Sequence, residues 1–87
     1  LVAEVDTCGD ADDVFVDDKR KLVYITCGAG FIDVLKADDP KYSRIAKIPT
    51  VAGARTGLFI SEMGRLMLAV RAQIGEPAAI WVYRTAP

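Results

Sequence analysis

KLVYITCGAGFIDVL, residues 21–35, is the stretch that decides how this chain folds. Two apolar runs, Leu22–Ile25 and Phe31–Leu35, flank a short turn that contains Gly28 and Gly30. Apolar runs of this length, separated by a few residues that include glycine, are typical of a β-hairpin. The sequence therefore predicts two antiparallel strands in this stretch.

More strands are predicted on both sides of the hairpin. Short apolar or alternating runs recur along the chain, and Gly, Pro and clustered Asp residues separate them. Residues 66–74 also fit a helical period, but the β-branched and aromatic spacing elsewhere favours strands. We expect an all-β chain with strands near residues 1–7, 12–16, 22–26, 31–36, 42–48, 56–61, 66–71 and 78–84.

Length and composition limit what the chain does. Its 87 residues, of which 52% are hydrophobic, make one small domain with a core. A net charge of −1 argues against a nucleic-acid partner, and no apolar run is long enough for a membrane span. No signal peptide is recognisable, and the chain starts at Leu1 rather than Met. We therefore expect a processed product or a piece of a longer chain.

The two halves of the chain differ in charge. Residues 1–43 contain ten acids and five bases, whereas residues 44–87 contain six bases and two acids. Such a polarised chain can place its acidic half against the basic half of a copy of itself or of a neighbouring segment. Chance clustering of charges on solvated turns is the alternative.

An internal repeat is visible when the two halves are aligned. Residues 1–7 match residues 44–50 at an offset of 43, and residues 14–16 match 58–60 at an offset of 44. The strand at residues 31–34 then matches residues 80–83 after a five-residue insertion in the preceding loop. Each unit contains four strands over about 44 residues, which is the period of a four-stranded propeller blade.

Residues 24–28, Tyr-Ile-Thr-Cys-Gly, carry a family resemblance. They resemble the Tyr-Val-Thr-Asn-Gly signature of the YVTN-type seven-bladed β-propellers, and residues 12–17, 30–34 and 75–83 are also similar to those bacterial proteins. The resemblance covers about two blades' worth of such a protein and implies a segment like its C-terminal end. It also implies export, to the periplasm or beyond.

On this reading the chain is a single segment made of antiparallel blade repeats. Residues 8–49 form the first blade, and residues 50–87 form a second blade that lacks its outer strand. Residues 1–7 are an orphan outer strand that belongs to a neighbouring blade. Because a propeller needs 4 to 8 blades, the expected partners are the remaining blades of a longer chain or copies of this chain that close a ring by strand exchange.

Few residues in the chain are suited to catalysis or metal binding. The absence of histidine removes the imidazole base of most hydrolytic mechanisms and the commonest metal ligand. Cys8 and Cys27 are too few for a structural zinc site, and Asp10, Asp12 and Asp13 lack the glycine and distal glutamate of an EF-hand loop. We therefore expect no metal and no cofactor. Loops of a blade that lie at one end bring the cysteines near each other, so they form either a disulfide or two buried thiols.

The same end of the blades collects the candidate ligand-binding residues. Two arginines among them are suited to bind a carboxylate or phosphate bidentately. The alternative is that both arginines pair with acids of the adjacent blade, such as Asp12 or Asp13. The candidate set is Asp12, Asp13, Arg55, Thr56, Arg71 and Glu76.

From the sequence, the expected function is that of a structural or binding scaffold without catalysis of its own. The resemblance keeps a lactonase-like hydrolase as an alternative, because some seven-bladed relatives have that activity. A self-associating module that uses its open sheet edge is the third interpretation.

Overall fold

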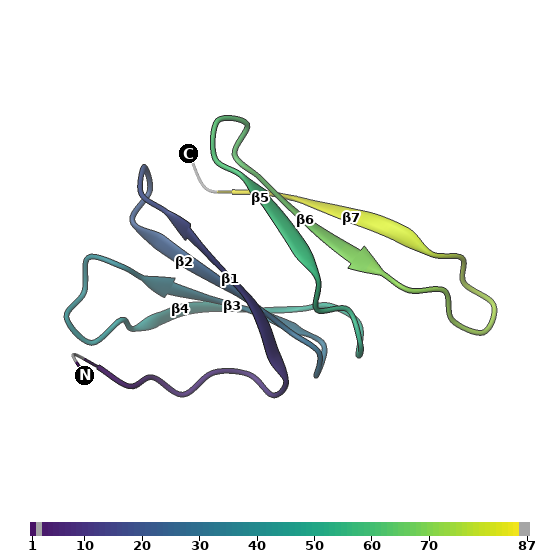
Figure 1. Ribbon diagram of the computed structural model, residues 1–87, viewed down its shortest axis with the longest axis horizontal. Coiled ribbons are helices and arrows are strands. Elements are labelled where there is room, and N and C mark those ends of the chain that lie inside the picture. Colours follow the sequence, from purple (N-terminus) through teal and green to yellow (C-terminus); the bar gives the residue numbers. More distant parts are fainter. Residues whose placement is uncertain (2, 86–87) are drawn as a thin grey trace.

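The computed structural model, which describes residues 1 and 3–85, is all-β and contains two antiparallel sheets (Figure 1). Sheet A has four strands in the order β1-β2-β3-β4, and sheet B has three in the order β5-β6-β7. The described residues include no helix, so none of them forms a helix that could span a membrane. The all-β prediction is confirmed. The strands are β1 (Ala11–Asp17), β2 (Leu22–Cys27), β3 (Phe31–Lys36), β4 (Arg44–Pro49), β5 (Gly57–Ile60), β6 (Arg65–Val70) and β7 (Ala79–Arg84).

The predicted hairpin forms the centre of sheet A. Strands β2 and β3 pair antiparallel from Leu22 opposite Lys36 to Cys27 opposite Phe31. Gly30 ends the turn with a φ of 106°, a conformation that glycine adopts without steric cost. Both faces of the hairpin are buried, so its run of apolar residues is continuous rather than alternating.

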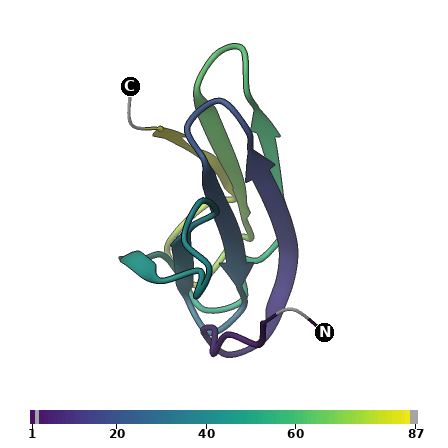
Figure 2. The same cartoon turned by 90° about the vertical axis from the view of Figure 1, so that its left-hand side faces the viewer.

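One face of sheet A packs against sheet B, and we call these the inner faces. The buried cluster between them contains Tyr24, and the Tyr24 ring lies 5.4 Å from that of Phe59, centroid to centroid. Strands β1 and β5 lie next to each other where the sheets meet (Figures 1 and 2). The two sheets therefore share one core, whose fully packed members are Tyr24, Ile32, Val34, Ala54, Leu66, Leu68 and Val70.

The N-terminal segment covers part of the outer face of sheet A. Val5 and Cys8 pack with Ile25, Cys27 and Leu35 in a second cluster. The predicted strand at residues 1–7 is not formed by its described residues, because no neighbouring strand lies beside them to complete a ladder; residue 2 lies outside the described part. The segment instead runs alongside sheet A (Figure 1).

The start of β4 was predicted two residues too early. Tyr42 has a φ of 51°, which is incompatible with an extended strand. Asp39 shapes this turn, since its side chain accepts hydrogen bonds from the Lys41 amide (2.9 Å) and the Ser43 hydroxyl (2.5 Å). These two bonds, with the Ser43 hydroxyl the stronger cause, lower the pKa of Asp39. Local side-chain bonding of this kind overrides the alternating pattern.

The structure corrects the predicted repeat by one residue. The β1–β2 and β5–β6 turns each enclose four residues, between Asp17 and Leu22 and between Ile60 and Arg65. Equivalent positions are therefore 43 apart in these strands, and the predicted offset of 44 is wrong. For the third strands the offset is 48, because Phe31 and Ala79 occupy equivalent places. The five-residue insertion in the loop remains.

Backbone conformation supports the offset of 43 independently. Asp10 and Gly53 both have positive φ, at 58° and 87°, and so do Lys21 and Gly64, at 58° and 61°. Each pair is separated by 43 residues. A shift of one residue reverses the face on which every side chain of a strand lies, so the corrected offset decides which faces of the two sheets are equivalent.

Candidate functional site

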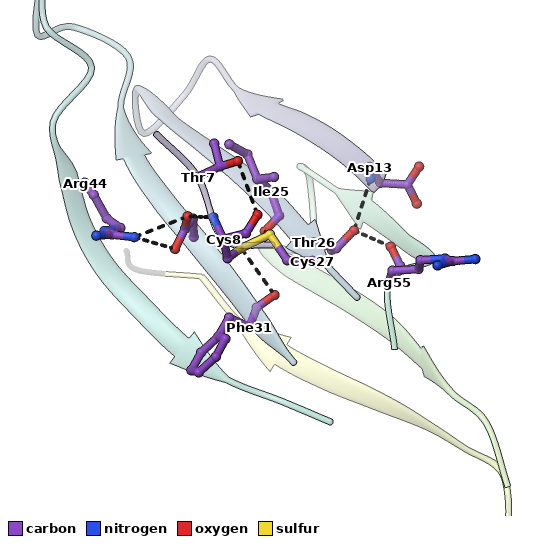
Figure 3. Close-up of a disulfide and its surroundings, with 10 residues drawn as sticks. Thr7, Cys8, Asp13, Ile25, Thr26, Cys27, Phe31, Arg44 and Arg55 are labelled. Atoms are coloured by element: carbon purple, nitrogen blue, oxygen red, sulfur yellow. Dashed lines mark hydrogen bonds and ion pairs between the residues drawn. A yellow bond between two sulfur atoms is a disulfide. The ribbon is translucent and has the colours of Figure 1, made fainter. Parts of the chain in front are cut away.

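A partly buried polar contact joins sheets A and B at the loop end where they meet. Asp13 accepts a hydrogen bond from the Gly57 amide at 2.9 Å, which joins β1 to β5. The Thr26 hydroxyl accepts from the Asp13 amide at 3.3 Å and donates to the Arg55 carbonyl (Figure 3). Thr26 is fully buried. We call these four residues, Asp13, Thr26, Arg55 and Gly57, the inter-sheet clamp.

The Arg55 side chain also pairs across the two sheets. Its Nη1 atom lies 2.7 Å from Oδ2 of Asp10, and both side chains are about half exposed. The hydrogen bond to Asp10, together with the charges of Asp10 and Asp12, raises the pKa of Arg55. Pairing with an acid of the neighbouring sheet was the alternative reading of the arginines; the partner is Asp10 rather than Asp12 or Asp13.

Arg71 is placed differently from Arg55. A Cβ atom at Gly53 would lie 3.0 Å from Nη2 of Arg71, so the guanidinium covers that glycine. Arg71 forms no ion pair with any residue that the structure describes. A cavity of about 190 Å³ next to it is lined by Gly53, Arg55, Thr56, Ala69 and Arg71. Its guanidinium is thus available to a small anionic group.

The six candidate residues are divided between the inter-sheet clamp, the solvent-exposed surface and two cavities that share Arg71. Asp13 belongs to the inter-sheet clamp, and Asp12 is exposed. Arg55 and Thr56 share the small cavity with Arg71, whereas Glu76 lies in the connection between β6 and β7, where its backbone exchanges two hydrogen bonds with Gln73. A groove of about 400 Å³ on that side is lined by Val51, Val70, Arg71, Gln73, Glu76, Pro77, Ala79 and Trp81.

Cys8 and Cys27 form a disulfide, with Cα atoms 5.9 Å apart (Figure 3). Their neighbour Asp33 is fully buried; it accepts a hydrogen bond from the Cys8 amide at 2.7 Å and lies 3.3 Å from the Arg44 guanidinium. Sequence reasoning did not single out Asp33, although an acid inside the apolar run of β3 was the available signal. Disulfide and carboxylate together fix Cys8 on the outer face of sheet A.

The same three residues resemble a metal site only in their spacing. Ligand atoms of Cys8, Cys27 and Asp33 lie within 4.8 Å of one another. Metals bind cysteine as a thiolate, and here the two sulfur atoms are bonded to each other. The cluster in this state therefore offers one carboxylate, which is already paired with the Cys8 amide and Arg44.

Comparison of the chain with protein-family models, with curated proteins and with solved structures found no significant match.

Proposed function

We propose that the chain is a pair of consecutive β-propeller blades that acts as a structural and binding scaffold without catalysis of its own. The observation that carries this proposal is the relation between the two sheets. The first and second strands of the two units are equivalent at an offset of 43 residues, and the first strands of the two units lie side by side. This is the relation expected of neighbouring blades, whose first strands line a common centre.

The inter-sheet clamp supports a structural role for the loop end. Asp13, Thr26 and Arg55 direct polar atoms between the sheets, where they satisfy one another. Buried polar groups that are fully paired fix one relative placement of the elements that carry them. Asp10, Asp13 and Arg55 are therefore used at this end to join the sheets.

Arg71 is the residue through which the scaffold would bind a ligand. It lies beside the small cavity and, among the described residues, has no acidic partner. A guanidinium recognises carboxylate or phosphate groups with two parallel hydrogen bonds. The hydrolase alternative has no support from a specific contact, since the sequence has no histidine and Arg55 is paired with Asp10.

Replacing Asp13 tests the proposed blade pair. In Asp13→Ala the Gly57 amide loses its charged acceptor, and we expect a loss of about 2 kcal/mol in the free energy of unfolding. The nuclear Overhauser contact between the Tyr24 and Phe59 rings should also weaken. Asp12→Ala is the matched control, because Asp12 is the adjacent exposed acid and lies outside the clamp.

Two results would contradict the proposal. The first is the absence of the Tyr24–Phe59 contact from the wild-type chain, which would mean that the two sheets do not pack as neighbouring blades; equal stability and an unchanged contact in both variants would refute the clamp alone. The second is a stoichiometric divalent ion in the purified chain together with lactone hydrolysis, which would favour the hydrolase.

A further inference from the structure

Both sheets expose apolar side chains on the faces that point away from each other. On the outer face of sheet B, Leu58, Ile80 and Val82 are 56%, 61% and 55% exposed. On the outer face of sheet A, Val14 and Val16 are 61% and 56% exposed. Rows of exposed apolar residues of this kind mark surfaces that contact another protein surface.

The corrected repeat identifies what each outer face is suited to contact. Ile80 and Val82 of sheet B are the equivalents of Ile32 and Val34 of sheet A, which are 0% and 5% exposed because they pack on sheet B. The outer face of sheet B thus repeats the inner face of sheet A.

The converse relation holds for the outer face of sheet A. Ile25 is the equivalent of Leu68, and Val16 is the equivalent of Phe59; Leu68 and Phe59 both lie in the core between the sheets. The contact between sheets A and B inside one chain is therefore a template for a contact between sheet B of one chain and sheet A of another.

The sheet edges complement each other in the same way. Among the described strands, β7 has a partner only on the β6 side, and its other edge is where an equivalent of β4 would pair. Residues 1–7 are equivalent to residues 44–50, which include β4, and Val5 corresponds to Ile48, the partner of Ile32. Val5 already faces the outer side of sheet A, where the disulfide at Cys8 holds the segment.

We propose that a second copy of this chain packs head to tail on the first. The outer face of sheet B of the first copy lies on the outer face of sheet A of the second copy. Residues 3–6 of the second copy pair with β7 of the first, so that Val5 of the second copy lies opposite Ile80 of the first. Charge favours this pairing, because residues 1–7 contain two acids and no base whereas residues 50–87 contain four arginines and two acids. This proposal rests on the proposed blade pair and identifies a second copy of the chain as the partner of that pair.

Substitutions on the outer face of sheet B test the contact in the purified chain. We expect Ile80→Glu to weaken association at least tenfold in sedimentation equilibrium, because the contact would bury an unpaired carboxylate. Ile80 is 61% exposed in the single chain, so its fold should tolerate the change. Ile74→Glu is the matched control, since Ile74 is fully exposed in the β6–β7 connection, and it should associate like the wild type.

A mixing experiment tests the head-to-tail direction. Val14→Glu should block the outer face of sheet A as Ile80→Glu blocks that of sheet B, so each variant alone should associate at least tenfold more weakly than the wild type. Mixed together, they retain one intact pair of faces and should form a complex of one copy of each that grows no further. In the wild-type complex, hydrogen exchange should show protection of the amides of residues 3–6.

The proposal is overturned if the wild-type chain is monomeric at all concentrations, or if Ile80→Glu and Ile74→Glu associate equally. It is also overturned if the two variants do not combine. The Tyr24–Phe59 contact is measured on the same samples: if it persists in a monomeric wild type, the second copy is refuted while the blade pair within the chain stands.

Discussion

At the scale of single residues, Tyr24 places a polar group inside the core. The Tyr24 hydroxyl is buried and has no hydrogen-bond partner among the described residues, although its ring packs on Phe59. Burial, and secondarily the charge of Asp17, raises the pKa of Tyr24 above its ordinary value of 10.0, while Arg20 acts in the opposite direction. The neutral form of this hydroxyl is thus favoured by folding.

Tyr24→Phe should therefore change how stability depends on pH. Because the folded-state pKa is raised, the stabilising difference is complete below the unfolded pKa and is lost as the pH rises above about 10. At neutral pH, removal of an unpaired buried hydroxyl should raise the free energy of unfolding by about 1 kcal/mol.

Urea titrations at neutral and alkaline pH measure both effects of Tyr24→Phe. Burial also raises the pKa of Tyr83, so Tyr83→Phe should remove a further part of the alkaline loss. An unchanged pH profile in the Tyr24→Phe, Tyr83→Phe double variant would contradict this explanation.

The disulfide should contribute substantially to the stability of so small a chain. Cys8 and Cys27 are 19 residues apart, and closure of a loop of this length stabilises by about 3 kcal/mol. A Cys8→Ser, Cys27→Ser double variant should lose that amount in urea unfolding, and reductant should affect the wild type but not this variant. If reductant leaves the wild-type unfolding midpoint unchanged, the expected contribution is absent.

At the scale of the elements, equivalent turns place different residues in the same left-handed backbone conformation. The residue before β2 is Lys21 and the residue before β6 is Gly64, and both have a φ near 60°. Only glycine adopts this conformation without strain, which for other residues costs about 1 kcal/mol. The two turns are thus a matched pair within one chain.

Lys21→Gly should raise the free energy of unfolding by about 1 kcal/mol, whereas Gly64→Ala should lower it by at least that amount. At Gly64 a Cβ atom would also lie 2.9 Å from Nη2 of Arg20 and from Oγ1 of Thr85, so a steric term adds to the strain. Thermal unfolding of the two variants gives both values. Shifts of the same sign would mean that the turns are not equivalent and would count against the offset of 43.

These turns also explain how far the sequence could predict the fold. The strands from Ala11 onward were predicted to within two residues, since apolar runs bounded by turn residues locate them. The offset between equivalent strands was not predicted correctly. The similarity of Leu22 to Leu66 favoured an offset of 44 residues, and the positive φ of Lys21, which supports 43, is not indicated by its residue type. The roles of Asp13 and Arg55 in the clamp were not predicted for a related reason: they depend on contacts between the two sheets.

For the molecule as a whole, the proposed head-to-tail contact between copies sets a condition on the number of blades. A head-to-tail contact generates a closed ring if its rotation closes and an open polymer if it does not. A ring built from copies of this chain must contain an even number of blades. It cannot therefore have the seven blades of the proteins that residues 24–28 resemble.

Native mass spectrometry and electron microscopy test this consequence. Since closed propellers have about 4 to 8 blades, we expect a single species of two, three or four times the 9.4 kDa chain mass, with a central axis in projection. The rotation that relates sheet A to sheet B within the chain should also relate sheet B to sheet A of the next copy, so that successive copies are related by this rotation applied twice. Two results would contradict closure of a ring by whole copies of the chain. One is a series of masses without an upper limit, and the other is a ring with an odd number of blades. The first result would mean that the contact leaves an open polymer, and the second would mean that further blades come from another chain.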